Sequence, residues 1–138
     1  MHKFISITNY FIILFLLFSA CKVLENRDYI PFALSDASYY SWFAEGNESG
    51  TNIQIKLINV DPEVEFDSII FRNVMVPVYT SEEGNELILN SVVPGGSSKI
   101  SIQKDRIEKS DRLIFKFRGR KREFLLNKIR REKMRYYL

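Results

Sequence analysis

Alternation of apolar and polar residues is the main pattern of the chain from residue 39 onward. Ile53, Ile55 and Leu57 alternate with polar neighbours, and so do Leu113, Phe115 and Phe117. A period of two is typical of β-strands with one buried face and one solvent-exposed face. Further runs with strand character cover residues 39–43, 64–71, 74–78, 86–92, 99–104 and 123–129. The sequence therefore predicts seven or eight short strands, without a helix of useful length between them.

Turn-forming residues separate these runs. The predicted turns are Asp61-Pro62, Arg72-Asn73, residues 81–85, residues 94–98 and residues 119–122. Pro77 lies inside one run, and because proline cannot donate a hydrogen bond to a neighbouring strand, that run is predicted to be an edge strand or a bulge. Short strands at a spacing of roughly ten residues are typical of sandwiches and barrels. We predict an antiparallel, immunoglobulin-like all-β sandwich over residues 38–129.

The first 20 residues have a different character from the rest of the chain. A positively charged start precedes an uncharged apolar run from Tyr10 to Phe18, and two small residues, Ser19 and Ala20, precede Cys21. This is the layout of a secretory signal peptide, ending at a cysteine that a lipoprotein peptidase would expose for acylation. We predict a signal peptide helix over residues 1–20, lipid attachment at Cys21 and a linker over residues 21–37.

Two alternatives to lipidation stay open at this point. Phe18 stands where leucine is usual ahead of the small residues, so the segment would otherwise be an uncleaved single-pass signal anchor or would direct a soluble secreted product. The apolar run is shorter than the roughly 20 residues that a membrane-spanning helix needs, which favours cleavage. No aspartate follows Cys21 directly, and this favours the outer membrane over the inner membrane of the cell envelope.

The residues that most enzymes need are missing from the predicted mature chain. His2 and Cys21 are the only histidine and the only cysteine, which excludes histidine-activated nucleophiles and zinc sites built from these residues. The sequence has no glycine-rich phosphate loop. The carboxylates between Asp61 and Asp67 fall at every second position, which predicts a solvated strand face rather than a converging calcium site. We expect no enzymatic activity, no metal and no cofactor.

An aromatic cluster comprises Tyr39, Tyr40, Trp42 and Phe43. In one interpretation, Tyr40 and Trp42 form a stacking platform for a carbohydrate or a peptide. In the other, these two large side chains fill the core of the domain, where aromatic residues contribute most to stability. We favour the core interpretation.

Charge is separated along the chain. Residues 25–86 contain 12 acidic and 3 basic side chains, whereas residues 87–138 contain 15 basic and 5 acidic side chains. Residues 130–138 are predicted to be a basic tail. In one interpretation the tail contacts an anionic membrane surface; in the other it only keeps the chain end solvated. The basic residues concerned are Arg130, Arg131, Lys133 and Arg135.

The predicted location of the protein in the cell envelope implies two kinds of binding partner. A tether at Cys21 implies a lipid membrane as one partner, and the edge marked by Pro77 is a candidate for docking to a larger envelope protein. An extracytoplasmic location argues against nucleic acid. The expected role is that of an envelope lipoprotein whose sandwich acts as a binding or structural module.

Four short segments carry a resemblance to a known group. The segments Ser19-Ala20-Cys21-Lys22, Trp42-Phe43-Ala44, Thr51-Asn52-Ile53 and Phe66-Asp67-Ser68-Ile69 resemble those of small uncharacterised lipoproteins of Bacteroidetes-type bacteria. The resemblance implies a surface or periplasmic lipoprotein with an immunoglobulin-like all-β domain. It implies no catalytic residue.

Overall fold

The computed structural model describes residues 29–95 and 110–137. The predicted signal peptide helix, Cys21 and the predicted strand over residues 99–104 lie outside these ranges. Within them, no helix is long and apolar enough to span a membrane. The regular elements are β1 (Ala33–Ala44), the 3-10 helix η1 (Glu45–Asn47), β2 (Ser49–Ile58), β3 (Val64–Phe71), β4 (Val74–Pro77), β5 (Tyr79–Glu83), β6 (Glu86–Pro94), β7 (Arg112–Phe117), β8 (Arg120–Leu125), β9 (Arg130–Arg131) and β10 (Arg135–Tyr137).

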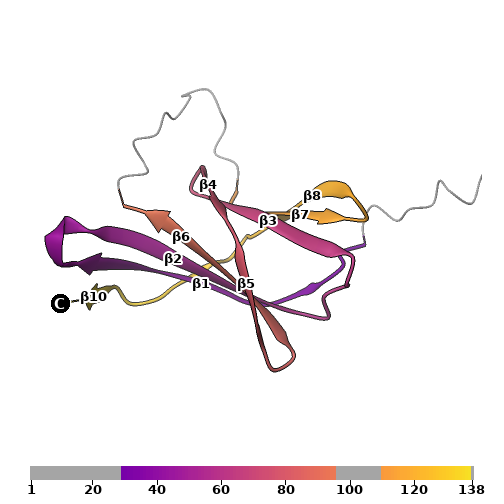
Figure 1. The fold of residues 1–138 in the computed structure, drawn as a ribbon, viewed down its shortest axis with the longest axis horizontal. Helices are drawn as coiled ribbons and strands as arrows, with labels where there is room; N and C mark the ends of the chain where they lie inside the picture. Colours follow the sequence, from indigo (N-terminus) through magenta and orange to yellow (C-terminus); the bar gives the residue numbers. More distant parts are fainter. Residues whose placement is uncertain (1–28, 96–109, 138) are drawn as a thin grey trace, which may run out of the picture. The chain divides into compact units, whose positions relative to one another are not determined.

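The strands form two sheets (Figure 1). Sheet A has the order β10-β1-β2-β6-β5, with β9 also beside β1, and sheet B has the order β4-β3-β7-β8. The pairings among β1 to β8 are antiparallel. The orders β1-β2-β6-β5 and β3-β7-β8 match the ABED and CFG sheets of an immunoglobulin constant-type domain, and β4 is an additional strand beside β3. The predicted immunoglobulin-like all-β sandwich is confirmed.

One hydrophobic core joins the two sheets. Ile53, Ile55 and Leu57 of β2 are at most 1% exposed, and they belong to one cluster with Leu113 and Phe115 of β7. Burying one such side chain contributes about 1.5–3 kcal/mol. The period of two in these strands therefore identified the inward side chains.

Two-residue turns connect several neighbouring strands. Arg72 and Asn73 have φ values of 47° and 65°, as a type I′ hairpin turn requires, and this confirms the turn predicted there. Arg118 and Gly119 join β7 to β8 with φ values of 51° and 74°. The predicted turn over residues 119–122 was therefore misplaced, because β8 already begins at Arg120.

The chain moves from sheet B to sheet A at Pro77. Within the described residues, β4 pairs only with β3 and ends at Pro77, so the edge-strand prediction is confirmed. β5 then pairs with β6 in sheet A. Residues 81–83 were predicted to turn, but they belong to β5, and the turn is confined to Gly84 and Asn85.

Residues 31–37 are part of the sandwich, although the predicted linker extended to residue 37. Phe32 is 6% exposed, and its ring contacts Phe66, Phe115 and Phe124 at centroid distances of 5.6, 5.1 and 5.2 Å. β1 begins at Ala33. The linker prediction was wrong here because one phenylalanine after Pro31 fills the space between the sheets without any periodic pattern around it.

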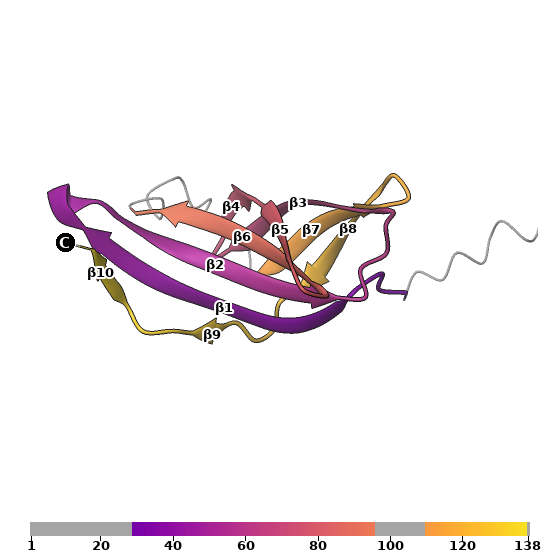
Figure 2. The ribbon, with the colours of Figure 1, turned by 60° about the horizontal axis from the view of Figure 1, so that its bottom comes forward.

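The C-terminal segment is also part of the sandwich. β9 and β10 run parallel to β1 at the edge of sheet A, with Ser38 opposite Arg130 and Trp42 opposite Arg135 (Figure 2). The backbone N–H of Glu132 donates to the carbonyl of Tyr39 at 2.8 Å. Residues 130–137 are therefore not a free basic tail.

Candidate functional site

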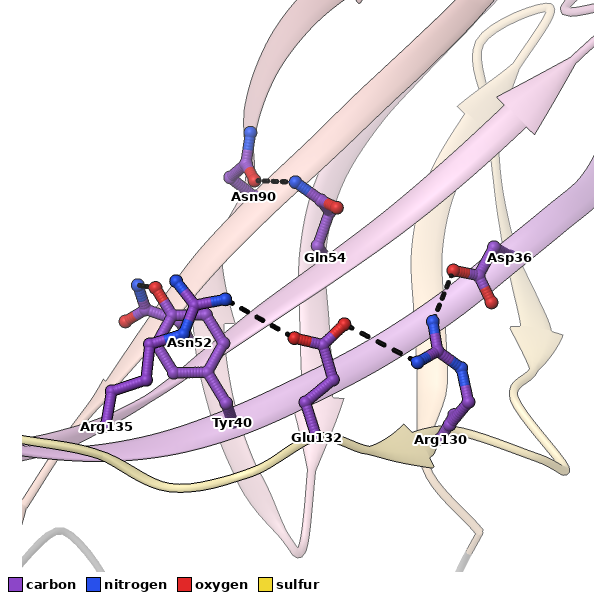
Figure 3. Close-up of polar contacts among 8 residues, drawn as sticks. All are labelled: Asp36, Tyr40, Asn52, Gln54, Asn90, Arg130, Glu132 and Arg135. Carbon is purple, nitrogen blue, oxygen red and sulfur yellow. Dashed lines mark hydrogen bonds and ion pairs between the residues drawn. The ribbon is translucent and has the colours of Figure 1, made fainter.

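The outer face of sheet A, which points away from the core, holds a group of aromatic and amide side chains. On β1 and β2, Tyr40 lies opposite Asn52, and on β2 and β6, Gln54 lies opposite Asn90. Side chains of directly opposed residues share one face of a sheet. Figure 3 shows these side chains together with charged residues of β1 and the C-terminal segment.

Asn52 connects the two aromatic residues of this face. Its Oδ1 accepts a hydrogen bond from the indole N–H of Trp42 at 2.9 Å, and its Nδ2 donates to the hydroxyl of Tyr40 at 2.8 Å. Trp42 lies over Gly50, where an added Cβ would be only 2.7 Å from the indole ring. Glycine at this position therefore lets the indole lie flat on β2.

The C-terminal segment covers part of this face. The guanidinium of Arg135 lies 3.8 Å from the centroid of the Tyr40 ring, and Tyr137 meets Trp42 edge to face at 6.3 Å. A cation over an aromatic ring is attracted by the electron density of the ring. One face of Tyr40 is therefore already occupied by the protein itself.

A chain of ion pairs holds the segment in place. Glu132 contacts Arg135 at 3.5 Å and Arg130 at 3.6 Å, and Arg130 contacts Asp36 of β1 at 3.0 Å (Figure 3). Exposed ion pairs of this kind contribute about 0–1 kcal/mol each. The network therefore orients the segment more than it stabilises the fold.

The pKa of Tyr40 is raised above its usual value of 10.0. Partial burial under the C-terminal segment is the main cause, and a hydrogen bond with Tyr137 adds to it, whereas the hydrogen bond with Asn52 acts in the opposite direction. The folded protein therefore favours the neutral, protonated form of the Tyr40 hydroxyl.

The aromatic cluster is divided between the two faces of β1. Tyr39 packs against the core, whereas neither Tyr40 nor Trp42 belongs to the core cluster. The core interpretation was wrong for these two residues because side chains alternate along β1, so that an inward Tyr39 places Tyr40 on the outer face.

The four basic residues predicted to contact a membrane fall into two pairs. Arg130 and Arg135 take part in the ion pairs on the outer face. Arg131 and Lys133 are exposed, and no ion pair joins either of them to another residue of the described chain.

Sequence reasoning did not single out Asn52, Gln54 or Asn90. All three are the polar members of an alternating strand pattern, and such residues are usually only solvated. The contacts of Arg135 and Glu132 with this face had no sequence signal, since they depend on the pairing of β10 with β1.

Metal binding finds no support in the part of the chain that the structure describes. No three His, Cys, Asp or Glu side chains lie close enough together there to hold an ion. Of the carboxylates considered as calcium ligands, Glu63 instead pairs with Arg118 at 2.7 Å. Asp61 accepts a hydrogen bond from the backbone N–H of Glu63.

No protein family model matches the sequence, and no curated protein or solved structure is similar to it. The function is therefore inferred from the residues of the chain itself.

Proposed function

We propose that the protein is a lipoprotein of the bacterial cell envelope whose sandwich binds a carbohydrate on the outer face of sheet A. Acylated Cys21 would tether the domain to the membrane, and the absence of an aspartate directly after Cys21 favours the outer membrane. The observation that carries the binding proposal is the position of Tyr40, Trp42, Asn52, Gln54 and Asn90, which share the face turned away from the core.

The chemistry of this face suits a sugar. Amide side chains both donate and accept hydrogen bonds, which matches the hydroxyl groups of a saccharide. Gln54 and Asn90 are within 3.4 Å of each other, a weak contact that leaves most of their hydrogen-bonding capacity for a ligand. The indole ring of Trp42 beside such amides would pack against the apolar C–H groups of the sugar ring.

The C-terminal segment sets the shape of the proposed site. Because Arg135 covers the Tyr40 ring, a bound sugar would contact Trp42 and the amides rather than stack on Tyr40. Arg135 and Glu132 would then border the site and offer a charged group on its rim.

Fluorescence of Trp42 tests the binding proposal, because Trp42 is the only tryptophan in the sequence. We expect a saturable change in emission with at least one glycan of a panel that includes envelope and plant-type polysaccharides. Replacing Gln54 and Asn90 by alanine should weaken that binding. Asn127→Ala is the matched control, because Asn127 is an exposed amide outside the sheets. A flat response to the whole panel would reject the carbohydrate proposal.

The tether is tested separately by mass spectrometry of membrane-extracted protein. We expect an N-terminal peptide that begins at Cys21 and carries the mass of acyl chains. An intact N-terminus in the membrane fraction would instead identify a single-pass signal anchor. A Cys21→Ser variant processed and retained like the native protein would reject lipidation.

A further inference from the structure

A groove of about 630 Å³ opens between the β5–β6 hairpin of sheet A and the start of β3 in sheet B. This volume lies in the range of about 300–1,000 Å³ that is usual for ligand-binding pockets. Val64, Phe66 and Leu87 line it with apolar surface, and all three are only partly buried against the core. Part of the apolar surface in the groove is therefore not buried by the fold.

The rim of the groove is acidic. Asp61, Glu65, Glu82 and Glu86 line it, and none of the lining residues is lysine or arginine. No ion pair joins any of these four carboxylates to another residue of the described ranges. Glu65 lies opposite Lys116 of β7, but the lining of the groove itself carries only negative formal charge.

β5 offers an open strand edge beside this groove. Among the strands that the structure describes, it is the last of sheet A on that side, and all five of its residues are exposed. Gly84 begins the turn to β6 with a φ of 62°, and a two-residue turn makes Glu83 and Glu86 a hydrogen-bonded pair. Because hydrogen-bonded pairs alternate along antiparallel strands, the backbone N–H and C=O groups of Thr80 and Glu82 point away from β6.

The same two residues, Thr80 and Glu82, also line the groove. Their partners on β6, Leu89 and Leu87, face the core, so both side chains lie on the inner face of sheet A. A strand added beside β5 would place alternate side chains on this side of the sheet, since opposed residues in neighbouring strands share a face. The open backbone groups of β5 therefore lie beside the apolar lining and the acidic residues of the groove.

We propose that β5 and the groove form a docking site for an extended basic segment of a partner protein. The segment pairs with β5 through backbone hydrogen bonds, and its alternate lysine or arginine side chains meet Glu65 and Glu82. The basic C-terminal segment of this chain does not fill the role within the same molecule, because it lies at the opposite edge of sheet A, beside β1. The site is independent of the proposed carbohydrate face.

A fluorescein-labelled peptide of alternating lysine and valine tests the proposal by fluorescence anisotropy with the full-length protein in detergent. We expect saturable binding that weakens as salt is raised, and no binding of the corresponding glutamate and valine peptide. Glu82→Lys should weaken binding by at least about tenfold, because it reverses a charge in the groove.

Glu83→Lys is the matched control, because Glu83 is the next residue of the same strand but does not line the groove. We expect it to change the affinity by no more than about twofold. Thr80→Pro removes an outward N–H while keeping the charge of the groove, and proline is tolerated at strand edges. It should therefore abolish binding, with circular dichroism verifying the fold.

Three results would overturn the proposal. The first is an absence of saturable binding. The second is an equal loss of binding in Glu82→Lys and Glu83→Lys, which would indicate unspecific attraction to an acidic surface. The third is self-association in sedimentation that Glu82→Lys abolishes without any peptide binding, which would assign the groove to a second copy of the chain.

Discussion

Asn52 is the residue on which the geometry of the outer face depends. Its amide is the common partner of the Trp42 indole and the Tyr40 hydroxyl, and no other residue of the described chain hydrogen-bonds to both. Glycine at position 50 leaves the room that the indole needs. The orientation of both aromatic rings therefore follows from two small or polar residues of β2.

Replacing Asn52 by alanine should loosen Trp42. The substitution removes the partner of the Trp42 indole N–H and one of the hydrogen bonds of the Tyr40 hydroxyl. We therefore expect the free energy of unfolding to fall by about 1–3 kcal/mol. Tryptophan emission should shift to longer wavelength as the indole becomes more solvated. Gln54→Ala is the control, since its contact with Asn90 is longer at 3.4 Å. Chemical denaturation and emission spectra would measure both effects, and equal behaviour of the two variants would contradict this role of Asn52.

Tyr40 should make the stability of the domain sensitive to alkaline pH. Its pKa is raised in the folded protein, so above about pH 10 the unfolded chain loses this proton first. Stability is then complete below the unfolded pKa and declines as pH rises through the folded pKa. We expect the melting temperature of the native protein to fall more steeply above pH 10 than that of Tyr40→Phe, which lacks the titrating group. Parallel curves for the two proteins would show that the tyrosine does not contribute.

At the scale of elements, the C-terminal segment differs from the rest of sheet A. Its strands β9 and β10 contain two and three residues, all exposed, whereas β2 buries three residues almost completely. The contacts that hold the segment are short backbone pairings with β1, ring contacts such as that of Phe43 with Tyr136, at 6.0 Å, and exposed ion pairs. Such elements open with little free energy.

Hydrogen exchange should therefore separate the edge from the core. We expect the amides of residues 130–137 to exchange well before those of Ile53, Ile55 and Leu57, because the edge detaches without unfolding the sandwich. Arg135→Ala should accelerate exchange of the edge while leaving the β2 amides unchanged. Mass spectrometry of peptic fragments would resolve these regions. Equal protection of edge and core would mean that β9 and β10 unfold only with the whole domain.

At the scale of the whole molecule, the separation of charge along the sequence is partly cancelled by the fold. Glu63 pairs with Arg118 and Asp36 pairs with Arg130, and each pair joins an acidic residue of the first half to a basic residue of the second. This follows from the sandwich topology, in which β3 of the first half pairs with β7 of the second half. Some charged side chains of the described residues take part in no such pair.

Arg131 and Lys133 are two such charges, and they test the membrane-contact hypothesis. Replacing both by glutamate should weaken binding of unlipidated protein to anionic vesicles at low salt, since each basic residue near such a surface contributes about 1 kcal/mol. Replacing Lys116 and Lys121, two exposed lysines of sheet B, by glutamate is the control for net charge. Vesicle sedimentation is the measurement, and equal losses in both variants would show that only total charge matters.

Prediction from sequence succeeded where a local pattern had one structural solution. Ile53, Ile55 and Leu57 could be buried together only in a strand, and Arg72-Asn73 could connect two strands only by a tight turn. It failed at Phe32, which has no periodic neighbours, and at Tyr40, whose face depended on its register with β2. Aromatic residues fit either face of a strand near a sheet edge. The residue type alone therefore does not show whether such a side chain points into the core or onto the outer face.

The sequence by itself determined the fold class, the inward faces of the central strands and the absence of histidine and cysteine from the described domain. These follow from side-chain periodicity and from composition, which are properties of neighbours in the chain. Only the tertiary structure decided that Asn52 binds two aromatic residues, that residues 130–137 complete sheet A, and that β5 borders an acidic groove. Each of these depends on the pairing of segments far apart in sequence, and pairing is fixed by the packing of the whole sandwich.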